Sequence, residues 1–458
     1  MIERYTPKKI GRIWTLGMKF KMWLVVELAV IKARVNLGDY PEEKYLRIRK
    51  AAKFTVRAVE ARDREIEHDL QAFVDIVRQS LPTELRADFH QRITSYDTED
   101  PAQALLMLKA MDIILQDLDV LIERLTHIAG RHMWTYCMGV THGQDGRVIT
   151  YAGRLCVYLD GLRQSRQMLV SIRDQLSMTK CSGAMGNYGS ISPELESEVL
   201  NILKLKVRPA ASQIVLRDSI ARFLSEIAIL GGVLEKIALD NFILGQTAYR
   251  EVIEPRKKKQ KGSSAMPHKK NTILNERERG MPRVLRGNAI AALENIATPL
   301  ERDISQSSVE RIILPDSTIL IDYMLQLMTK IISGMEVNRD QMALGINRTY
   351  GCWASEEVKS VLCDELCGKK TPYTPEDVYY FVQACAFTAM EKREQLTIIL
   401  QQSLFPRTDA VDSNLLSKLI IHGTLDKCFD FKTSLINNMP AVYERNGLNN
   451  TLAMDPNC

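Results

Sequence analysis

Two adjacent serines lie inside a lysine-rich segment of the sequence, and this combination could remove a proton from carbon. Residues 260–271 read QKGSSAMPHKKN. Gly262 permits backbone angles that other residues avoid, and Pro267 prevents a continuing helix, so the segment is expected to form a loop. The positive field of the lysines would favour the alkoxide form of Ser263 or Ser264 and would attract anionic substrates. The segment therefore predicts a loop with an acid–base group, and a solvated Lys/Ser linker is the alternative.

A histidine between two glycines is a second acid–base candidate. Residues 137–143 read CMGVTHG, and Gly139 and Gly143 are expected to end the preceding helix and to present His142 on a bend. Histidine gains and loses its proton near neutral pH, which suits a general acid or base. Taken alone, a surface or capping histidine is an equally good interpretation.

A third group of residues is suited to binding phosphate. Residues 300–316 place Arg302, Ser307 and Arg311 in a mostly polar stretch before an apolar helix. Ser307 and Arg311 are four apart in sequence and share a face if the stretch is helical. A guanidinium offers a planar fork of donors to paired oxygens, so this composition suits phosphate, and solvated surface charge is the alternative.

One histidine lies on a predicted amphipathic helix. His68 stands between Glu67 and Asp69 within the segment 65–80, whose apolar residues recur at helical spacing. A single histidine on such a helix is usually structural, and its sequence position alone does not favour a functional role.

Two polar segments contain further candidates. The run 89–97, which includes His90, Thr94 and Ser95, shows little helical periodicity. The second segment contains the candidate Gln213. It is followed by Arg217 and Asp218, for which the alternative interpretation is an ion pair on a helix.

These motifs together resemble the fumarase/aspartase superfamily, whose members release fumarate from a substituted succinate by β-elimination. Gly-Ser-Ser-x-Met-Pro-x-Lys-x-Asn at 262–271 is similar to the superfamily signature, and Gly-x-Thr-His at 139–142 is similar to its second motif. The segment 300–316 and the pair Arg4-Tyr5 resemble the adenylosuccinate lyase family more closely than fumarase or argininosuccinate lyase. The resemblance extends over nearly the whole chain.

The resemblance implies a stepwise mechanism that uses no cofactor and no metal. Ser263 would remove a proton from the carbon beside a carboxylate, while Lys269 and Asn271 stabilise the anion. His142 would protonate the departing nitrogen, and Ser264 stays open as an alternative base. His68 would bind substrate and assist either the general acid or the phosphate. The positions that the resemblance implies for substrate binding are Arg4, Tyr5, Glu67, Asp69, His90, Thr94, Ser95, Gln213, Ser264, Met266, Asn271, Glu276, Arg302, Ser307 and Arg311.

The implied reactions are cleavage of adenylosuccinate to AMP and of SAICAR to AICAR, both in purine nucleotide biosynthesis. The resemblance also implies a homotetramer whose active sites take motifs from several subunits. The alternatives are another fumarate-releasing lyase, such as argininosuccinate lyase, and a non-catalytic structural member of crystallin type. The presence of both Ser263 and His142 argues against the structural alternative.

Some positions depart from the family pattern, and they bear on substrate preference and rate more than on the type of reaction. The residues carrying the chemistry, Ser263, His142, Lys269 and Asn271, are all present. The departures are Tyr96, Val140, Asp145, Gly146 and Thr272.

Long amphipathic helices are the elements that must position these residues. Apolar spacing of three and four residues predicts helices at 20–37, 42–59, 65–80, 101–130, 153–176, 212–247, 281–296 and 316–334, with shorter ones from 374 to about 405. Asp100-Pro101 is read as the start of one of them. Several of these segments are apolar around most of their circumference, which indicates oligomeric packing. The prediction is an all-α fold with a central bundle and with domains at 1–112, 113–365 and 366–458.

Composition restricts the other classes of function. The net charge is +5, but acidic and basic residues alternate, so no nucleic-acid partner is expected. No run of eighteen apolar residues and no leader-like start occur, so we expect a cytosolic protein without membrane contact. The 9 cysteines are scattered and lack metal-ligand spacing, which indicates neither a disulfide framework nor a zinc site.

Overall fold

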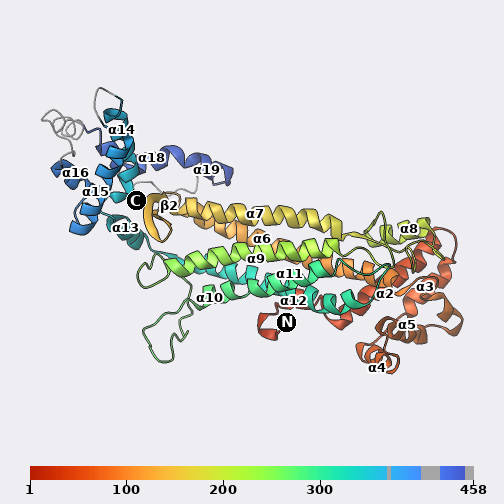
Figure 1. Ribbon diagram of the computed structural model, residues 1–458. Helices are drawn as coiled ribbons and strands as arrows, with labels where there is room; N and C mark the ends of the chain where they lie inside the picture. The colour runs from red at the N-terminus through yellow and green to blue at the C-terminus, as the bar shows by residue number, and fades with distance from the viewer. Residues whose placement is uncertain (369–372, 404–422, 449–458) are drawn as a thin grey trace. The chain divides into compact units, whose positions relative to one another are not determined.

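The predicted all-α fold is confirmed, with only short strands added to the helices (Figure 1). The computed structural model describes residues 1–368, 373–403 and 423–448. These residues form two compact units. Unit 1 contains Met1–Leu121, Gly161–Lys236 and Arg277–Thr329, and unit 2 contains the described residues of Ile122–Asp160, Ile237–Glu276 and Lys330–Cys458. The division into three domains stays a prediction.

The long helices and the short helix α10 contribute residues to both units. Their bounds are α6 Ser95–Arg131, α7 Tyr151–Leu176, α9 Asp218–Leu244, α10 Ile273–Gly280 and α12 Ser305–Gly334. The elements wholly inside unit 1 are η1 Glu3–Tyr5, α1 Lys8–Gly11, α2 Leu16–Asn36, α3 Glu42–Ala51, α4 Val56–Ile66, α5 Asp69–Ser80, η2 Thr83–Asp88, β3 Met178–Thr179, α8 Pro193–Leu203, β4 Lys206–Val207 and α11 Pro282–Glu294.

Unit 2 combines two antiparallel strand pairs with a set of short helices. Its elements are β1 Tyr136–Thr141, β2 Gln144–Thr150, β5 Val252–Ile253, β6 Glu336–Val337, α13 Arg339–Asn347, η3 Cys352–Ala354, α14 Ser355–Leu366, α15 Pro375–Lys392, α16 Leu396–Gln402, η4 Asp426–Phe429, α18 Phe431–Asn438 and α19 Pro440–Arg445. The antiparallel pairs are β1–β2 and β5–β6, whereas β3 and β4 of unit 1 pair in parallel.

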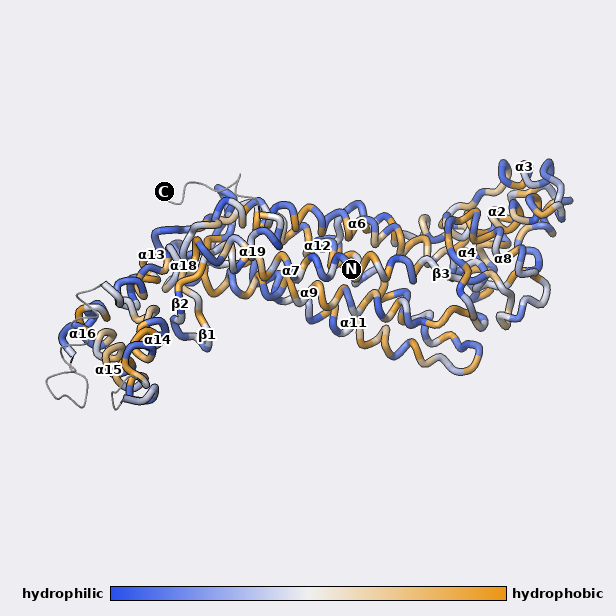
Figure 2. The backbone as a smooth tube through the Cα atoms, turned by 90° about the horizontal axis from the view of Figure 1, so that it is seen from above, coloured by the Kyte–Doolittle hydropathy of each residue, from blue (hydrophilic) through white to orange (hydrophobic). Residues whose placement is uncertain are grey.

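In unit 1, five helices pack as a closed ring, each against the next. The side-chain contacts run in the order α6–α7, α7–α9, α9–α11, α11–α12 and α12–α6. The pairs that make them are Asp112–Arg173, Gly161–Val233, Glu235–Arg286, Asn288–Ser317 and Gln326–Asp117. Figure 2 shows apolar and polar residues interleaved along these helices, as expected where one stripe of each helix is buried.

Two glycines allow the helices of this ring to approach closely. A Cβ atom on Gly231 of α9 would lie 2.8 Å from Leu285 of α11. A Cβ atom on Gly161 of α7 would lie 3.2 Å from Val233 of α9. Larger residues would therefore push these helices apart, because buried helices are already packed to crystal-like density.

The C-terminal helices of unit 2 have a core of their own. Helices α14, α15 and α16 bury a cluster that includes Val358, Phe381 and Leu396. The predicted helix start at Thr374 is confirmed as a reciprocal capping box with Asp377. The predicted end of this helical set near Phe405 lies outside the described residues. Among the described helices, none is long and apolar enough to cross a membrane.

Two helices begin earlier than predicted, and each continues through a proline. Helix α6 begins at Ser95, and Pro101 lies inside it. Likewise α12 begins at Ser305 and contains Pro315. Proline fits the first turn of a helix without loss, but it can also be accommodated further along at the loss of one backbone hydrogen bond.

Other boundaries differ because local side chains end or start a helix. The predicted helix 42–59 is two helices, since Thr55 accepts a hydrogen bond from the N–H of Ala58 and caps α4. Residues 212–217, predicted as helical, precede α9 instead. The hairpin β1–β2 was not predicted, because no Asn-Gly turn signal marks it.

Candidate functional site

The serine-bearing loop connects β5 to α10 in unit 2 (Figure 1), and Ser263 lies in a turn within this loop. The Ser263 hydroxyl oxygen accepts hydrogen bonds from the N–H groups of Ala265 at 3.2 Å and Met266 at 3.0 Å. The N–H of Lys269 donates to the carbonyl of Met266 at 3.0 Å, which closes the turn. The backbone thus fixes where the Ser263 hydroxyl lies.

Gly262 is required here for a different reason from the one predicted. Its φ is not in the left-handed region. A Cβ atom at Gly262 would instead lie 2.2 Å from the carbonyl oxygen of Lys269, far inside contact distance. A close approach of two backbone segments therefore selects glycine.

A buried carboxylate anchors both ends of this loop. Glu254, just after β5, accepts hydrogen bonds from the N–H groups of Leu274 at 3.1 Å and Asn275 at 3.2 Å and from the Asn275 side chain at 3.0 Å. Burial raises the pKa of Glu254 above its ordinary value, and the hydrogen bonds from Asn275 and Leu274 offset only part of this rise. The carboxylate satisfies N–H groups that the first turn of α10 leaves unpaired.

The other predicted residues of this loop face solvent in the single chain. Asn271 is half-buried, whereas Ser264, Met266, Lys269 and Glu276 are exposed. None of the interactions described within unit 2 joins His142 to Ser263. The loop therefore carries a preformed turn at the surface of the single chain.

His142 lies at the tip of the β1–β2 hairpin in unit 2. His142 and Gly143 have φ values of 53° and 74°, and they connect the paired residues Thr141 and Gln144. Two successive left-handed residues are the mark of a type I′ hairpin turn, which matches the twist of the strands. The predicted bend is confirmed, but it joins two strands, and the His142 side chain is exposed.

One departure from the family pattern has a structural role at this hairpin. Asp145 accepts two hydrogen bonds from Arg348, at 2.9 and 3.0 Å. Because Arg348 follows α13, this bidentate pair ties the start of β2 to that helix. The pair holds the base of the turn that carries His142.

In unit 1, His68 caps helix α5. Its Nδ1 accepts a hydrogen bond from the N–H of Gln71 at 3.2 Å. An accepting Nδ1 places the proton of the neutral ring on Nε2, which is then a donor. Glu67, immediately before it, ends α4 with a left-handed φ of 51°. Both side chains are exposed.

Asp69 joins two cations from different helices. Its Oδ2 lies 2.9 Å from Lys19 of α2 and 2.9 Å from Arg311 of α12. Burial alone would raise the pKa of Asp69, but Lys19 and Arg311 outweigh it and hold the pKa below its ordinary value. Two of the predicted substrate-binding residues, Asp69 and Arg311, are therefore in direct contact.

His90, which precedes the start of α6, is held by the buried carboxylate of Glu27 on α2. Its Nδ1 lies 2.7 Å from Oε1 of Glu27, which is 1% exposed and also accepts a hydrogen bond from Thr98 at 2.7 Å. The N–H of Thr94 donates to Asp97 at 2.9 Å, and Ser95 is the first residue of α6. The hydroxyls of Thr94 and Ser95 thus lie at a helix N-terminus, which favours anions.

Arg302 contacts two residues from other segments of unit 1, Gln213 and Tyr96. Its Nη1 donates to Oε1 of Gln213 at 2.8 Å, and its guanidinium carbon lies 3.8 Å from the centre of the Tyr96 ring. Ser307 forms a hydrogen bond with the Tyr96 hydroxyl, whose pKa is raised to about 12, chiefly by burial. Of the predicted phosphate residues, Arg302 and Ser307 share Tyr96 as a neighbour, whereas Arg311 pairs with Asp69.

Arg4 and Tyr5 form a separate contact at the N-terminus. The ring of Tyr5 packs edge-on against Tyr323 of α12 with centres 5.1 Å apart. Tyr323 in turn accepts a hydrogen bond from Arg277 at 3.0 Å. Arg4 is exposed, with its guanidinium carbon 6.0 Å from the Tyr5 ring.

Sequence reasoning missed the buried arginine that connects these segments. Arg217 is 1% exposed and pairs with Asp100 of α6 at 2.9 and 3.2 Å and with Glu310 of α12 at 2.9 Å. The alternative interpretation, an ion pair between Arg217 and Asp218, is wrong, since Asp218 pairs with Arg208. Arg217 therefore fixes the start of α6, the Gln213 segment and the start of α12 relative to one another.

A second buried pair holds the start of α6 from another side. Lys180 and Asp97 are 1% and 0% exposed and lie 2.8 Å apart. Lys180 also donates to the carbonyl oxygens of Gly183 and Gln213. Over the described ranges, no group of three His, Cys, Asp or Glu residues could hold a metal ion.

Comparison with known proteins identifies the class of this chain, which is a lyase. The sequence model of a family described as lyase matches residues 8–287. Two solved structures share the fold over nearly their full length. The fumarate lyase of Mesorhizobium sp. BNC1 has a TM-score of 0.83 at 19% identity and covers 98% of this chain and 99% of its own. The 3-carboxy-cis,cis-muconate lactonizing enzyme of Pseudomonas putida has a TM-score of 0.79 at 23% identity, with coverages of 97% and 98%.

Relatives with closer sequences identify the particular family. The adenylosuccinate lyase of Aquifex aeolicus is 38% identical over 448 residues, which cover 97% of this chain and 98% of the relative. That of Bacillus subtilis is 34% identical over 448 residues, with coverages of 98% and 100%. The chain belongs to the adenylosuccinate lyase family.

Proposed function

We propose that this chain cleaves adenylosuccinate to AMP and fumarate, and SAICAR to AICAR and fumarate. The observation that carries the proposal is the preformed turn around Ser263 in a chain that belongs to this family over nearly its whole length. The substrates are purine nucleotides, and the cell compartment that we propose is the cytosol.

The contacts of Ser263 support its role as the general base. Two backbone N–H groups donate to its oxygen. Hydrogen bonds to the charged form of an acid lower its pKa, so these donors favour the alkoxide that would remove the carbon-bound proton. Ser264 is exposed and has no such pair of donors within the described turn, which favours Ser263 over Ser264 as the base.

The proposed acid and anion-stabilising groups follow from the same mechanism. His142, at the tip of its hairpin, would donate a proton to the departing nitrogen. Lys269 and Asn271 would stabilise the carbanion intermediate as it forms. His68 would assist through its Nε2–H, because its Nδ1 is occupied by the N–H of Gln71.

The unit 1 residues are proposed to hold the anionic parts of the substrate. Arg302 has donors left after its single bond to Gln213, and its Nε is buried without a hydrogen-bond partner among the described residues. Together with Ser307 it suits a phosphate group. Thr94 and Ser95, at the start of α6, suit a carboxylate. Arg4, Tyr5, His90 and Asp69 complete the proposed set with Glu67, Gln213, Ser264, Met266, Glu276 and Arg311.

We also propose a homotetramer in which subunits share active sites. Its support is a series of large apolar side chains exposed on the long helices in the single chain. Examples are Val157, Met168, Ile229, Val284, Ile290 and Leu293. Exposed apolar surface repeated along neighbouring helices is typical of a subunit interface. The exposure of Ser263-loop residues and His142 fits sites completed by other subunits.

Measurement of fumarate release tests the proposed function. The purified chain is incubated in parallel with adenylosuccinate, SAICAR and argininosuccinate, and fumarate is measured by its ultraviolet absorbance. Release from the two purine substrates alone is the expected result. Release from argininosuccinate alone would replace the substrate assignment, and no release from any of the three would favour the non-catalytic alternative.

A further inference from the structure

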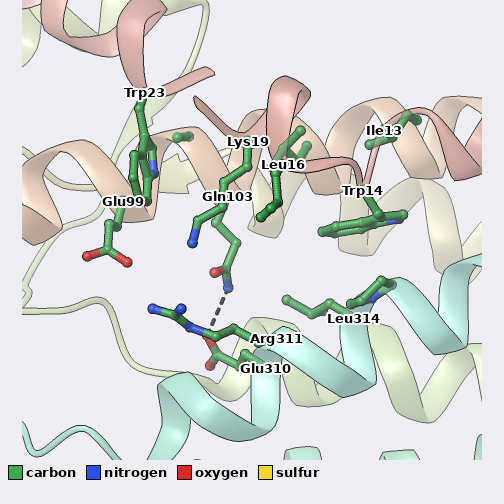
Figure 3. Close-up of a pocket in the computed structure, with 13 residues that line it drawn as sticks. Ile13, Trp14, Leu16, Lys19, Trp23, Glu99, Gln103, Glu310, Arg311 and Leu314 are labelled. Atoms are coloured by element: carbon green, nitrogen blue, oxygen red, sulfur yellow. Dashed lines mark hydrogen bonds between the residues drawn. The ribbon is translucent and has the colours of Figure 1, made fainter. Parts of the chain in front are cut away.

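Unit 2 contains a group of charged residues that has no role in the proposed mechanism. In unit 1, the cavity shown in Figure 3 is lined by Arg311, which is already assigned to the substrate, and by Glu310, which accepts a hydrogen bond from Gln103 at 2.9 Å. The group in unit 2 lies next to the hairpin β1–β2. Its members are Asp145, Arg154, Glu251 and Arg348.

Each strand of the hairpin that carries His142 is held by an arginine from a different helix. On β1, the carbonyl of Met138 accepts a hydrogen bond at 2.9 Å from Nη2 of Arg154, which lies on α7. On β2, Asp145 accepts two hydrogen bonds from Arg348, which follows α13. The pairing of the two strands is irregular directly after Met138. Arg154 therefore binds β1 where the backbone ladder is interrupted.

Glu251 is an acid that both arginines share. It is 3% exposed and lies directly before β5. Burial raises the pKa of Glu251, while the charges of Arg154 and Arg348 oppose this rise because they favour the ionised carboxylate. Asp145 is the second acid near Glu251. Two cations thus meet two anions, and the group as a whole is neutral.

The backbone of Glu251 is fixed on both sides. Its N–H donates to the carbonyl of Leu244, the last residue of α9, at 2.9 Å, and its carbonyl accepts from the N–H of Asn338 at 2.9 Å. Asn338 caps the start of α13. A Cβ atom on Gly345 of α13 would lie 3.1 Å from Oε1 of Glu251, so the carboxylate packs against that helix. Glu251 is therefore a fixed point from which the arginines can be held.

The environment of Arg154 makes Glu251 important for its charge. Nη1 of Arg154 is buried and has no hydrogen-bond partner among the described residues. The groups that act on its charge include the carboxylate of Glu251 and the thiol of Cys137, whose pKa burial raises to about 11. A buried cation that loses its carboxylate is strongly unfavourable and moves towards water. Loss of Glu251 should thus release β1 from Arg154.

We propose that Glu251 is a positioning residue for the proton donor, because through Arg154 and Arg348 it holds both strands of the hairpin and so fixes where His142 lies. This assignment rests on the proposed function, in which His142 protonates the departing nitrogen. A catalytic group displaced by about 1 Å can lower a rate by about 10²-fold. Glu251→Gln keeps the shape of the side chain without its charge, so it should lower kcat about 10- to 100-fold with little change in KM.

Mixed assemblies show which catalytic group Glu251 serves. If sites are shared, a Glu251→Gln chain supplies an intact Ser263 but a displaced His142. Unfolded and reassembled with an equal amount of Ser263→Ala chains, it should recover about one quarter of wild-type activity, because about one site in four takes both groups from the intact sources. With His142→Ala chains, the mixture should keep only about half the activity of Glu251→Gln alone, since about half of the sites then lack the imidazole.

Amide hydrogen exchange gives a second measurement that needs neither activity nor shared sites. Mass spectrometry should show faster exchange of residues 136–150 in Glu251→Gln than in the wild type, with the rate for α9 unchanged. Asp145→Asn weakens the hold on β2 from a partly exposed position and should have a smaller effect in the same direction. It replaces Glu251→Gln as the test if that variant fails to fold.

Glu356→Gln is the matched control. Glu356 lies 3.2 Å from Arg147 of the same hairpin, but both side chains are exposed, at 66% and 49%. An exposed pair contributes little. The control should therefore match the wild type in kcat, KM and hairpin exchange.

Several outcomes overturn the assignment. They are hairpin exchange in Glu251→Gln or its replacement that equals the control, a kcat within about twofold of the control, and rescue by neither partner chain. Rescue by His142→Ala chains alone would assign Glu251 to the serine-bearing loop instead. If Ser263→Ala and His142→Ala chains fail to rescue each other, shared sites are refuted, and kcat and exchange decide the role of Glu251. If the wild type releases no fumarate, the proposed reaction is refuted, and exchange alone decides whether Glu251 holds the hairpin.

Discussion

Replacement of Arg217 by methionine should strongly destabilise unit 1. Arg217 is 1% exposed, and its removal would leave Asp100 and Glu310, which are 5% and 4% exposed, without their cation. Breaking a buried ion pair by removing one partner typically loses about 3–5 kcal/mol. That corresponds to a factor of roughly 10²–10⁴ in the folding equilibrium, a large part of the stability of an ordinary domain.

The loss should depend on pH in a defined direction. Burial already raises the pKa of Glu310, and Arg217 is the charge that lowers it. Without Arg217 the pKa in the folded state rises further above the unfolded value of about 4.3. An acid whose pKa is raised on folding destabilises the protein above its folded pKa, and the effect disappears as the pH falls towards the unfolded value. The difference between wild type and Arg217→Met should therefore shrink from pH 8 to pH 5.

Urea unfolding followed by circular dichroism at several pH values measures this difference. Arg286→Met is the matched control, because Arg286 is 47% exposed and makes a single surface pair with Glu235 at 2.8 Å. Such a pair contributes less than about 1 kcal/mol. A loss for Arg217→Met no larger than that of the control, or one that does not vary with pH, would refute the reasoning.

The effect of Arg217 on activity can be separated from its effect on the stability of the protein. Arg217→Lys keeps one charge but loses the planar fork that joins Asp100 to Glu310. Because these partners start α6 and α12, we expect Arg217→Lys to raise KM for adenylosuccinate more than it lowers kcat. A lower apparent kcat with KM unchanged, which a smaller folded fraction would give, would indicate a purely structural role.

Further predictions concern the proposed chemistry and assembly. Ser263→Ala should reduce kcat by about 10²–10⁴ with little change in substrate binding, and Ser264→Ala should be milder; the reverse order in steady-state kinetics would reassign the base. Arg302→Ala or Arg311→Ala should raise KM for the phosphorylated substrate far more than for a dephosphorylated analogue, whereas equal losses would exclude phosphate binding. Equal amounts of Ser263→Ala and His142→Ala subunits, unfolded and reassembled together, should recover about one quarter of wild-type activity if sites are shared, and none if each site lies within one subunit.

The parts of the site that could be predicted from sequence are those made by neighbouring residues. The turn at 262–271 has its glycine, serines and proline within one short motif, and the structure shows them in one tight turn. Ser307 and Arg311 were expected to share a face if their stretch were helical, and both lie in α12. Local spacing determines local geometry, so such features can be read directly from the chain.

The parts that were missed depend on residues far apart in sequence. Arg217, Asp100 and Glu310 lie on three segments, and no periodicity connects them before the chain folds. The same holds for the contact between Glu27 and His90. Buried charges are rare enough that sequence alone favours solvated surface for each of them, and only the folded chain shows that they are paired.

The hairpin at His142 was missed for a more local reason. Its two turn residues are His142 and Gly143, and the most frequent type I′ turns contain Asn or Asp before Gly. Histidine is one of the few other residues that adopts a left-handed φ with some frequency. The histidine expected to act as an acid is thus also the residue that makes the turn.

Because Glu254 anchors both ends of the serine-bearing loop, the length of the loop can change while its ends stay in place. Since Glu254 binds Leu274 and Asn275, the closure of the segment between them is already accomplished by the fold. The entropic effect of extra residues in a closed loop grows slowly, by about 0.6 kcal/mol for each doubling of length. The basic run at 256–259, outside the tight turn at 262–271, is therefore a place where insertions or short peptide tags would be tolerated in evolution or engineering.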